Sequence, residues 1–424
     1  MKSRAMAWFL VALVCLAVSG PAQGAAKRLV WATCCNQVNR HELFQALARE
    51  YEAQHPDVEI AWVYPSGAPY YDILLTWIAG GSPADIMWLG LGFPRFVDLV
   101  LPLNDLVEKS GIEEIHPGML SMFTWQGQLL GLPFGTSTHT FAYNKELFNE
   151  AGVPYPTSEW TWNDLIRMGR LFTVDRSGGN QPTQRGVEID NLMHALNFGP
   201  GFYDADGRRA LLNNPVTIAG VQTYADIYSG KAGVSPGPVG GSRIQRFIDG
   251  QLAMVTVGIY DQPVVKASAP FDWDLVTFPW LIVDGEPHRS TDMSGEAWSI
   301  YKGTNHPQEA QDFVAFLLSK PVMERIVRAG IVVPSQRSLA AVYLESDGPP
   351  ANLIATMDSM DFGEMLPYAH PVGAEITQLI NASPEWNPLW HGELPAAQVL
   401  PQWERQVNQL LREYWDQVDQ RANE

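Results

Sequence analysis

Five consecutive side chains that can form hydrogen bonds occupy the run from Thr136 to Thr140, directly before the apolar residues Phe141 and Tyr143. Hydroxyl and imidazole groups in such a run can both donate hydrogen bonds to a small polar molecule and accept them from it. Two interpretations are open. The run is either a solvated edge strand, where serine and threonine are common, or a strand that crosses between two lobes and turns its hydroxyl groups toward a ligand.

The residues around this run predict a strand that leads directly into a short helix. Pro133 fixes its own φ angle and favours an extended conformation at Leu132. Asn144 is suited to cap the N-terminus of a helix, and Gly152 is suited to end it. The polar run therefore lies at the start of a strand-helix unit.

The same stretch resembles a known protein family. The sequence LPFGTST, followed by YNKELFNEAGVPYP and TWNDL within residues 132–165, is similar to the extracellular solute-binding proteins of family 1, the periplasmic receptors of ABC importers for sugars and related solutes. The resemblance implies a periplasmic-binding-protein type II fold, with two α/β lobes that are joined by hinge crossings. Each lobe is expected to contain a mainly parallel sheet flanked by helices.

The resemblance also implies a function. We expect a monomer that binds a small-molecule ligand, a sugar or a related polyol, in the cleft between the lobes and delivers it to the transmembrane subunits of an ABC permease. No cofactor is implied. Presentation of the closed form to a sensor kinase is an alternative, and so is a glycerol phosphate or another non-sugar solute as the ligand.

The length of 424 residues predicts two lobes, since it exceeds what one ordinary core supports. We expect a signal peptide over residues 1–25, a first lobe from residues 26–133 and 284–333, and a second lobe from residues 134–283 and 334–424. Because the chain crosses between the lobes three times, opening of the cleft is expected to be a hinge motion.

Alternating and helical patterns predict the elements near the start of the chain. Leu29–Ala32 and the alternating run from Val58 to Tyr64 are expected to be parallel strands joined by a helix, and Ala84–Leu89 is expected to be a third strand. In open α/β sheets the ligand crevice lies beyond the carboxyl ends of the strands. Cys35 and Asn36 should therefore lie at the wall of the cleft.

A sugar presents apolar C–H faces and a rim of hydroxyl groups, so its site needs flat aromatic rings and hydrogen-bonding groups. The resemblance places Ser137 at the crossing strand, Tyr260 at the end of a second-lobe strand, and Ser294 and Gly295 at the strand that returns to the first lobe. It also places a specificity residue of the second lobe near Tyr368 and His370. The complete set of expected ligand-binding residues is Cys35, Asn36, Trp88, Phe134, Ser137, Tyr260, Trp280, Ser294, Gly295, Tyr368 and His370.

Composition and motifs argue against other functions. The formal net charge is −18, whereas nucleic-acid binding needs clustered Lys and Arg. A secreted glycosidase would need two carboxylates at a defined separation, and Asp85, Glu296 and Glu364 stand in no recognisable arrangement. The run from Asp204 to Gly207 resembles a calcium loop but lacks the downstream Glu, so no metal site is expected there. Relatives that bind glycerol phosphates have an Arg near position 370, and this chain has none.

The N-terminus is typical of an export signal. Lys2 and Arg4 precede an apolar run from Ala5 to Val18, and small residues follow at 22–25. The alternative is a membrane anchor, but the run is shorter than the roughly 20 residues that span a bilayer. We therefore expect a periplasmic protein. The adjacent Cys34 and Cys35 could form a vicinal disulfide or remain two thiols, and the sequence leaves this open.

Overall fold

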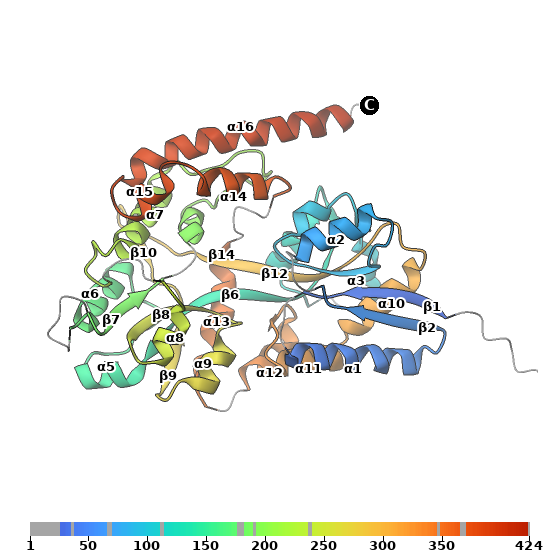
Figure 1. Cartoon of the computed structure of the whole chain (residues 1–424), viewed down its shortest axis with the longest axis horizontal. Coiled ribbons are helices and arrows are strands. Elements are labelled where there is room, and N and C mark those ends of the chain that lie inside the picture. Colours follow the sequence, from blue (N-terminus) through green and yellow to red (C-terminus); the bar gives the residue numbers. More distant parts are fainter. Residues whose placement is uncertain are drawn as a thin grey trace, which may run out of the picture.

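The computed structural model describes residues 26–34, 38–65, 70–110, 114–175, 182–189, 192–235, 240–345, 348–364 and 370–422. It shows two lobes that are connected by two long strands, β6 (Leu132–Asn144) and β12 (Thr291–Ile300) (Figure 1). The predicted signal peptide lies outside the described residues. Among the helices that are described, none is both long enough and apolar enough to cross a bilayer.

The first lobe carries β1, β2 and β3, which lie at the right of Figure 1. Its elements are β1 (Lys27–Ala32), α1 (Val38–Gln54), β2 (Val58–Val63), α2 (Tyr70–Ala79), β3 (Ile86–Leu89), η1 (Phe93–Phe96), α3 (Asn104–Ser110), α4 (Pro117–Met122), β4 (Thr124–Trp125), β5 (Gln128–Leu129), α10 (Pro307–Leu317), α11 (Lys320–Arg328), β13 (Val333–Pro334), η3 (Arg337–Leu339) and α12 (Ala340–Leu344).

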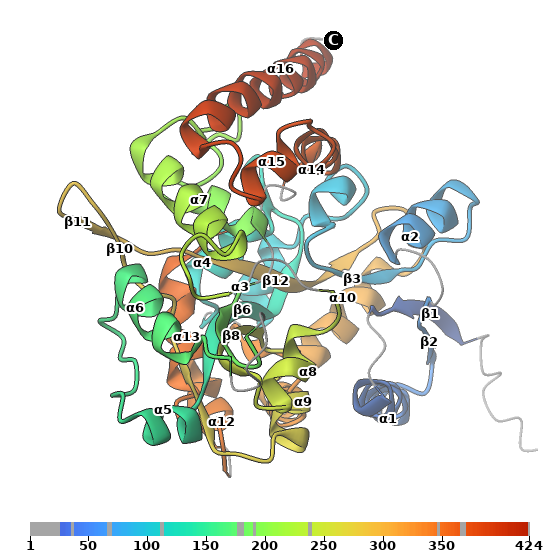
Figure 2. The ribbon, with the colours of Figure 1, turned by 60° about the vertical axis from the view of Figure 1, so that its left-hand side comes forward.

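The second lobe carries β7, β8 and β9, and its longest helix, α16, lies along the top of Figure 1. Its elements are α5 (Lys145–Ala151), α6 (Trp162–Phe172), β7 (Arg185–Glu188), η2 (Leu192–Asn197), α7 (Pro215–Tyr228), α8 (Arg243–Ile248), β8 (Leu252–Gly258), α9 (Gln262–Ser268), β9 (Trp273–Val276), β10 (Leu281–Val283), β11 (Glu286–His288), α13 (Ile354–Asp358), η4 (Ser359–Phe362), β14 (Gly363–Glu364), α14 (Gly373–Asn381), α15 (Trp386–Trp390) and α16 (Ala396–Ala422). Figure 2 shows the β10–β11 hairpin projecting away from this lobe.

One continuous sheet runs through both lobes in the order β2-β1-β3-β12-β6-β8-β7. The pair β1–β2 is parallel and is joined by α1, as the sequence predicts. β12 and β6 are antiparallel to each other and cross between the lobes. β13 pairs with β6 beside Thr136, so the predicted third crossing segment joins this sheet at the first-lobe end of β6. The strands of the two lobes are thus fixed to the same pair of crossing strands.

The strand-helix junction after the polar run has the predicted caps. The side-chain oxygen of Asn144 accepts hydrogen bonds from the backbone N–H groups of Glu146 (3.0 Å) and Leu147 (3.2 Å). Gly152 ends α5 in the left-handed conformation, with φ of 64°, which a residue without a Cβ adopts at little cost. These contacts determine where β6 ends and where the second lobe begins.

Aromatic side chains fill the two cores. In the first lobe Trp31, Trp88 and Trp298 are buried beneath α1 and α10. In the second lobe Phe141 and Trp162 are buried beside α6 and α7. Because β6 contributes side chains to both cores, the packing on either side determines the position of the polar run between them.

Candidate functional site

Five polar side chains lie in a row on one face of the crossing strands. Ser294 of β12 is directly opposite Ser137 of β6 in the antiparallel register. Directly opposite residues share a face of a sheet, and residues two apart along a strand share it too. Ser137 and His139 of β6 therefore lie on the same face as Asp292, Ser294 and Glu296 of β12. We call these five residues the polar stripe.

Strands from both lobes end beside the polar stripe. In the first lobe, Leu89 at the end of β3 pairs with Ala297, next to Glu296. In the second lobe, Gly258 at the end of β8 pairs with His139. Ligands of α/β sheets bind beyond the carboxyl ends of strands. The polar stripe therefore lies on the floor of the crevice in which this rule predicts a ligand.

The Ser137 hydroxyl is the clearest unsatisfied group in this floor. The residue is 8% exposed, and its Oγ has no hydrogen-bond partner within the described residues. A buried hydroxyl without a partner costs about 1–3 kcal/mol. The neighbouring Thr136, by contrast, donates from Oγ1 to the Ser294 carbonyl oxygen at 2.9 Å. Ser137 therefore keeps an unused hydroxyl, which neighbouring atoms cover in the absence of a ligand.

Tyr260 lies on the second-lobe side of the polar stripe, two residues after the end of β8. Its hydroxyl lies 2.9 Å from Nε2 of His139, and its side chain is 50% exposed. A Cβ at Gly258 would lie only 2.6 Å from the Tyr260 ring, so a glycine at that position lets the ring lie across the strand end. The ring is thus held at one edge while a large apolar surface faces solvent.

Glu296 lies at the first-lobe end of the polar stripe. Its carboxylate accepts a hydrogen bond from Nε1 of Trp88. The Arg40 guanidinium lies 4.5 Å from the centre of the Trp88 ring, and its charge acts on Glu296. Burial nevertheless raises the pKa of Glu296 to about 7, although Trp88 and Arg40 both act to lower it. This carboxyl group therefore changes its charge near neutral pH.

Replacing Glu296 with Gln is expected to change how stability depends on pH. The folded chain holds the carboxyl proton up to about pH 7, whereas the ordinary value of 4.5 applies to the unfolded chain. The free energy of unfolding of the parent chain should therefore fall as pH rises from about 4.5 to about 7. The free energy of unfolding of the variant minus that of the parent should therefore be larger at pH 8.5 than at pH 5, by up to about 3 kcal/mol. Melting temperatures at the two pH values test this, and a difference that does not grow with pH would contradict it.

Trp88 and Phe134, which were expected to stack on a ligand, lie in the core of the first lobe. Trp88 is 1% exposed, and its ring centre is 4.8 Å from that of Phe134. Phe134 is itself stacked on Trp298, with ring centres 4.5 Å apart and planes 11° apart. Neighbouring aromatic rings thus cover both side chains. We do not include either ring in the proposed site.

Gly295 and Trp280 differ in their relation to the polar stripe. Gly295 lies between Ser294 and Glu296, and a Cβ there would be 2.4 Å from the Phe123 ring on the opposite side of β12, so only its backbone can serve the contact expected of it. Trp280 precedes the β10–β11 hairpin, and the Arg289 guanidinium covers its ring at 4.2 Å. We therefore leave Trp280 out of the proposed site.

His370 is buried among aromatic rings in the second lobe. Its Nδ1 accepts a hydrogen bond from the backbone N–H of Val372 at 3.3 Å, and Tyr203 and Trp415 contact its ring. Burial lowers its pKa to about 4, so the imidazole is neutral at neutral pH. It is one of the residues that line a cavity of about 580 Å³, which Trp125 of the first lobe also lines.

A second cavity of about 430 Å³ adjoins this one through the shared Ser121, Met122 and Tyr203. It is lined by Met293, which alternates with the polar stripe on β12. Both cavities are interlobe spaces, and the second one lies on the Met293 side of the crossing strands, opposite the polar stripe. His370 lines the first cavity, which contains no residue of the polar stripe.

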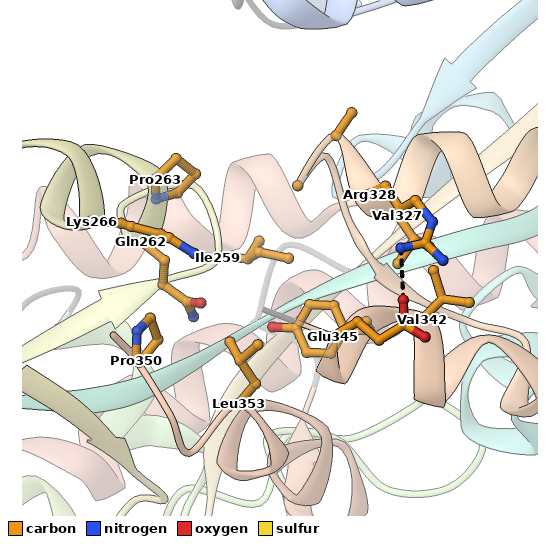
Figure 3. A pocket seen from close by; sticks show the side chains of 13 residues that line it. Ile259, Gln262, Pro263, Lys266, Val327, Arg328, Val342, Glu345, Pro350 and Leu353 are labelled. Carbon is orange, nitrogen blue, oxygen red and sulfur yellow. Dashed lines mark hydrogen bonds and ion pairs between the residues drawn. The ribbon is translucent and has the colours of Figure 1, made fainter. Parts of the chain in front are cut away.

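A smaller interlobe cavity of about 240 Å³ lies beside Ile259, the residue before Tyr260 (Figure 3). Gln262 and Lys266 of α9 line it from the second lobe, and Arg328 lines it from the first lobe. Arg328 donates a hydrogen bond to Glu345 at 2.8 Å. This cavity shows that the lobes also approach each other next to the end of β8.

Three expected site residues, Cys35, Asn36 and Tyr368, lie outside the described residues. Cys34 is buried and disulfide-bonded. Sequence reasoning did not include Asp292 in the site and considered Glu296 only as a glycosidase carboxylate. The signal for both was present, since Asp292, Ser294 and Glu296 alternate with Met293, Gly295 and Ala297 along the strand.

Comparisons with known proteins agree with this architecture. Residues 37–324 match the family model described as bacterial extracellular solute-binding protein. The arabinooligosaccharide-binding protein of Halalkalibacterium halodurans is 26% identical over 310 residues, which cover 69% of this chain and 67% of that protein. The chain thus spans about two thirds of the length of this curated relative.

Solved structures show the same two-lobed fold. An ABC substrate-binding protein from Listeria monocytogenes in complex with cycloalternan matches with a TM-score of 0.76 and 20% identity, over 91% of this chain and 99% of that one. The cyclic alpha-maltosyl-1,6-maltose binding protein from Arthrobacter globiformis matches with a TM-score of 0.76 and 21% identity, over 92% and 100% of the two chains. Since the match to the family model covers more than half of this chain, the chain belongs to the bacterial extracellular solute-binding proteins.

Proposed function

We propose that this protein binds a carbohydrate above the polar stripe and delivers it, chemically unchanged, to the permease of an ABC importer. The observation that carries the proposal is the half-exposed ring of Tyr260, whose hydroxyl contacts His139 two residues along β6 from the unsatisfied hydroxyl of Ser137. A flat apolar ring suits the C–H face of a sugar, and a buried hydroxyl without a partner suits its hydroxyl rim. The similar proteins, which bind arabinooligosaccharides, cycloalternan and cyclic alpha-maltosyl-1,6-maltose, support the same class of ligand.

The charges of the site favour a neutral ligand. Glu296 lies on the polar stripe and becomes charged above about pH 7, and a phosphate group bound beside it would face this carboxylate. Neutral hydroxyl groups, in contrast, can donate hydrogen bonds to carboxylates. We therefore place carbohydrates and polyols ahead of glycerol phosphates. The basic and apolar pattern of the first 25 residues supports export to the periplasm, where such a receptor would act as a monomer without a cofactor.

A thermal-shift screen tests the proposed function. The ligands are monosaccharides, arabino- and gluco-oligosaccharides, polyols and glycerol phosphates. Because a ligand that binds only the folded state stabilises it, a carbohydrate at about 100 times its Kd should add about 2.7 kcal/mol to the free energy of unfolding. Mass spectrometry of the recovered ligand should show it unaltered, which separates a receptor from a hydrolase. A melting temperature that responds only to non-carbohydrate solutes would overturn the proposal.

Replacing Ser137 with Ala is expected to weaken carbohydrate binding about fivefold and to leave the melting temperature of the free protein unchanged or slightly higher. The hydroxyl makes no hydrogen bond within the described residues, so its loss costs the free protein little, whereas the bound ligand loses one hydrogen bond worth about 1 kcal/mol. The matched control is Thr138→Val on the opposite face, because Thr138 donates to the Thr356 carbonyl oxygen at 3.0 Å. This control should lose stability and keep affinity. Calorimetric titration measures the affinities, and melting curves measure the stabilities. If the Ser137 variant kept its affinity while the Thr138 variant lost it, the prediction would be wrong.

A further inference from the structure

Two histidines and an aspartate from three separate elements meet below Tyr260. Nδ1 of His139 on β6 lies 2.5 Å from Oδ1 of Asp292 on β12. Nε2 of His194 on η2 lies 2.9 Å from Oδ2 of the same carboxylate. One potential ligand atom from each residue lies within 4.8 Å of the other two. We call these three residues the His-Asp-His cluster.

The cluster is closed to solvent. The side chains of His139 and Asp292 are each 6% exposed, and that of His194 is 2% exposed. Nε2 of His194 lies within hydrogen-bonding distance of Asp292, whereas its Nδ1 has no hydrogen-bond partner within the part of the chain that the structure describes. A buried ring nitrogen without a hydrogen bond is costly to keep. Pairing with Asp292 therefore leaves one nitrogen of His194 unsatisfied.

We propose that His139, His194 and Asp292 bind a divalent transition-metal ion, for which zinc is the best fit. Imidazole nitrogen and carboxylate oxygen are ordinary zinc ligands, and three protein ligands with an open fourth position form a known type of zinc site. Zinc ligand distances are about 2.0–2.2 Å, so ligand atoms around one ion lie within about 4.4 Å of one another. The 4.8 Å limit that holds for the three atoms here therefore requires the side chains to move together by a few tenths of an ångström when the ion binds. Calcium and magnesium prefer sites made only of oxygen ligands and fit this set poorly.

The surroundings of His139 agree with a metal ligand. Histidines that bind a metal through one nitrogen almost always use the other nitrogen in a hydrogen bond that orients the ring. Nε2 of His139 lies 2.9 Å from the Tyr260 hydroxyl, which leaves Nδ1 directed toward Asp292. The hydroxyl of Thr291 donates to the His139 carbonyl oxygen at 3.1 Å and fixes the backbone of β6 next to β12.

The ion would connect both crossing strands to η2 of the second lobe. Its binding should therefore raise the melting temperature even when no carbohydrate is present. The ion would also stabilise the orientation of Tyr260 through His139. If the proposed function holds, this should strengthen carbohydrate binding. Only this effect on carbohydrate affinity rests on the proposed function, and the metal site itself does not.

Metal binding can be measured directly on the full mature chain. The protein is purified without a polyhistidine tag, treated with a chelator, and titrated with Zn²⁺ against a chromophoric chelator. We expect one Zn²⁺ per chain and a melting temperature that rises by several degrees. Titration with Co²⁺ should give the visible absorption bands of a four-coordinate site. Absence of saturable Zn²⁺ binding to the folded chain would overturn the proposal.

Three variants separate the cluster from other histidines. His194→Gln and Asp292→Asn should each weaken Zn²⁺ binding at least tenfold. His370→Gln is the matched control, since His370 is also buried in the second lobe but lies outside the cluster. Circular dichroism establishes whether each variant is folded. If one variant fails to fold, the Co²⁺ spectrum of the unchanged chain still reports whether a four-coordinate site is present. Zn²⁺ affinity that is retained in both cluster variants would overturn the site, whatever the carbohydrate screen shows.

Discussion

Replacing Tyr260 with Ala will weaken carbohydrate binding by about 30-fold or more and will change the melting temperature of the free protein little. The ring is 50% exposed, so its removal leaves no large internal cavity. In the complex, however, the ring would cover an apolar face of the sugar, and truncation of a central aromatic contact commonly costs 2 kcal/mol or more. Isothermal titration calorimetry with the ligand found in the thermal-shift screen measures the loss.

Tyr260→Phe is the matched control for this prediction. It keeps the ring and removes the hydroxyl that lies 2.9 Å from His139. We expect Phe to keep most of the affinity, because stacking uses the face of the ring. If Phe and Ala lose affinity equally, the hydroxyl and not the face makes the contact. If Ala keeps full affinity, Tyr260 does not belong to the site.

Local sequence rules predicted the elements that position the site. Pro133, Asn144 and Gly152 act within a few residues of themselves, and β6 and α5 begin and end where these residues require. The alternating run from Val58 predicted β2, which pairs with β1 in parallel. These predictions succeeded because backbone sterics and capping depend on neighbouring residues and little on the remainder of the chain.

The orientation of aromatic side chains could not be predicted in the same way. Trp88 lies near the end of β3 and Phe134 lies in the crossing strand β6, both as expected, yet both turn into the core and pack on Trp298. Aromatic residues are suited to a core and to a sugar site for the same reason, which is their large apolar surface. The exposed position of Tyr260 depends on Gly258 and on contacts that no local pattern specifies.

The His-Asp-His cluster shows a different limit. His139 was noted in the polar run, but its partner Asp292 is 153 positions later in the chain and becomes its neighbour only through the register of β6 and β12. His194 comes from η2, between these two strands in sequence. Spacing along the chain carries no signal for a site of this kind, since each ligand comes from a separate element. Only the folded sheet brings the three together.

The stability of the first lobe should depend strongly on Trp298, and Trp298→Ala is expected to cost about 3–5 kcal/mol of unfolding free energy. The residue is 0% exposed and contacts Trp31 and Trp88, each with ring centres 5.4 Å away, besides its stacking on Phe134. Trp298→Phe should cost much less, because it leaves a smaller cavity and also removes an indole N–H that has no hydrogen-bond partner in the described residues. Urea unfolding followed by circular dichroism measures both variants. Phe134 lies on β6 only three residues before Ser137, so the Ala variant should also bind carbohydrate more weakly. If the variant lost neither stability nor affinity, this aromatic core would not hold the crossing strand in place.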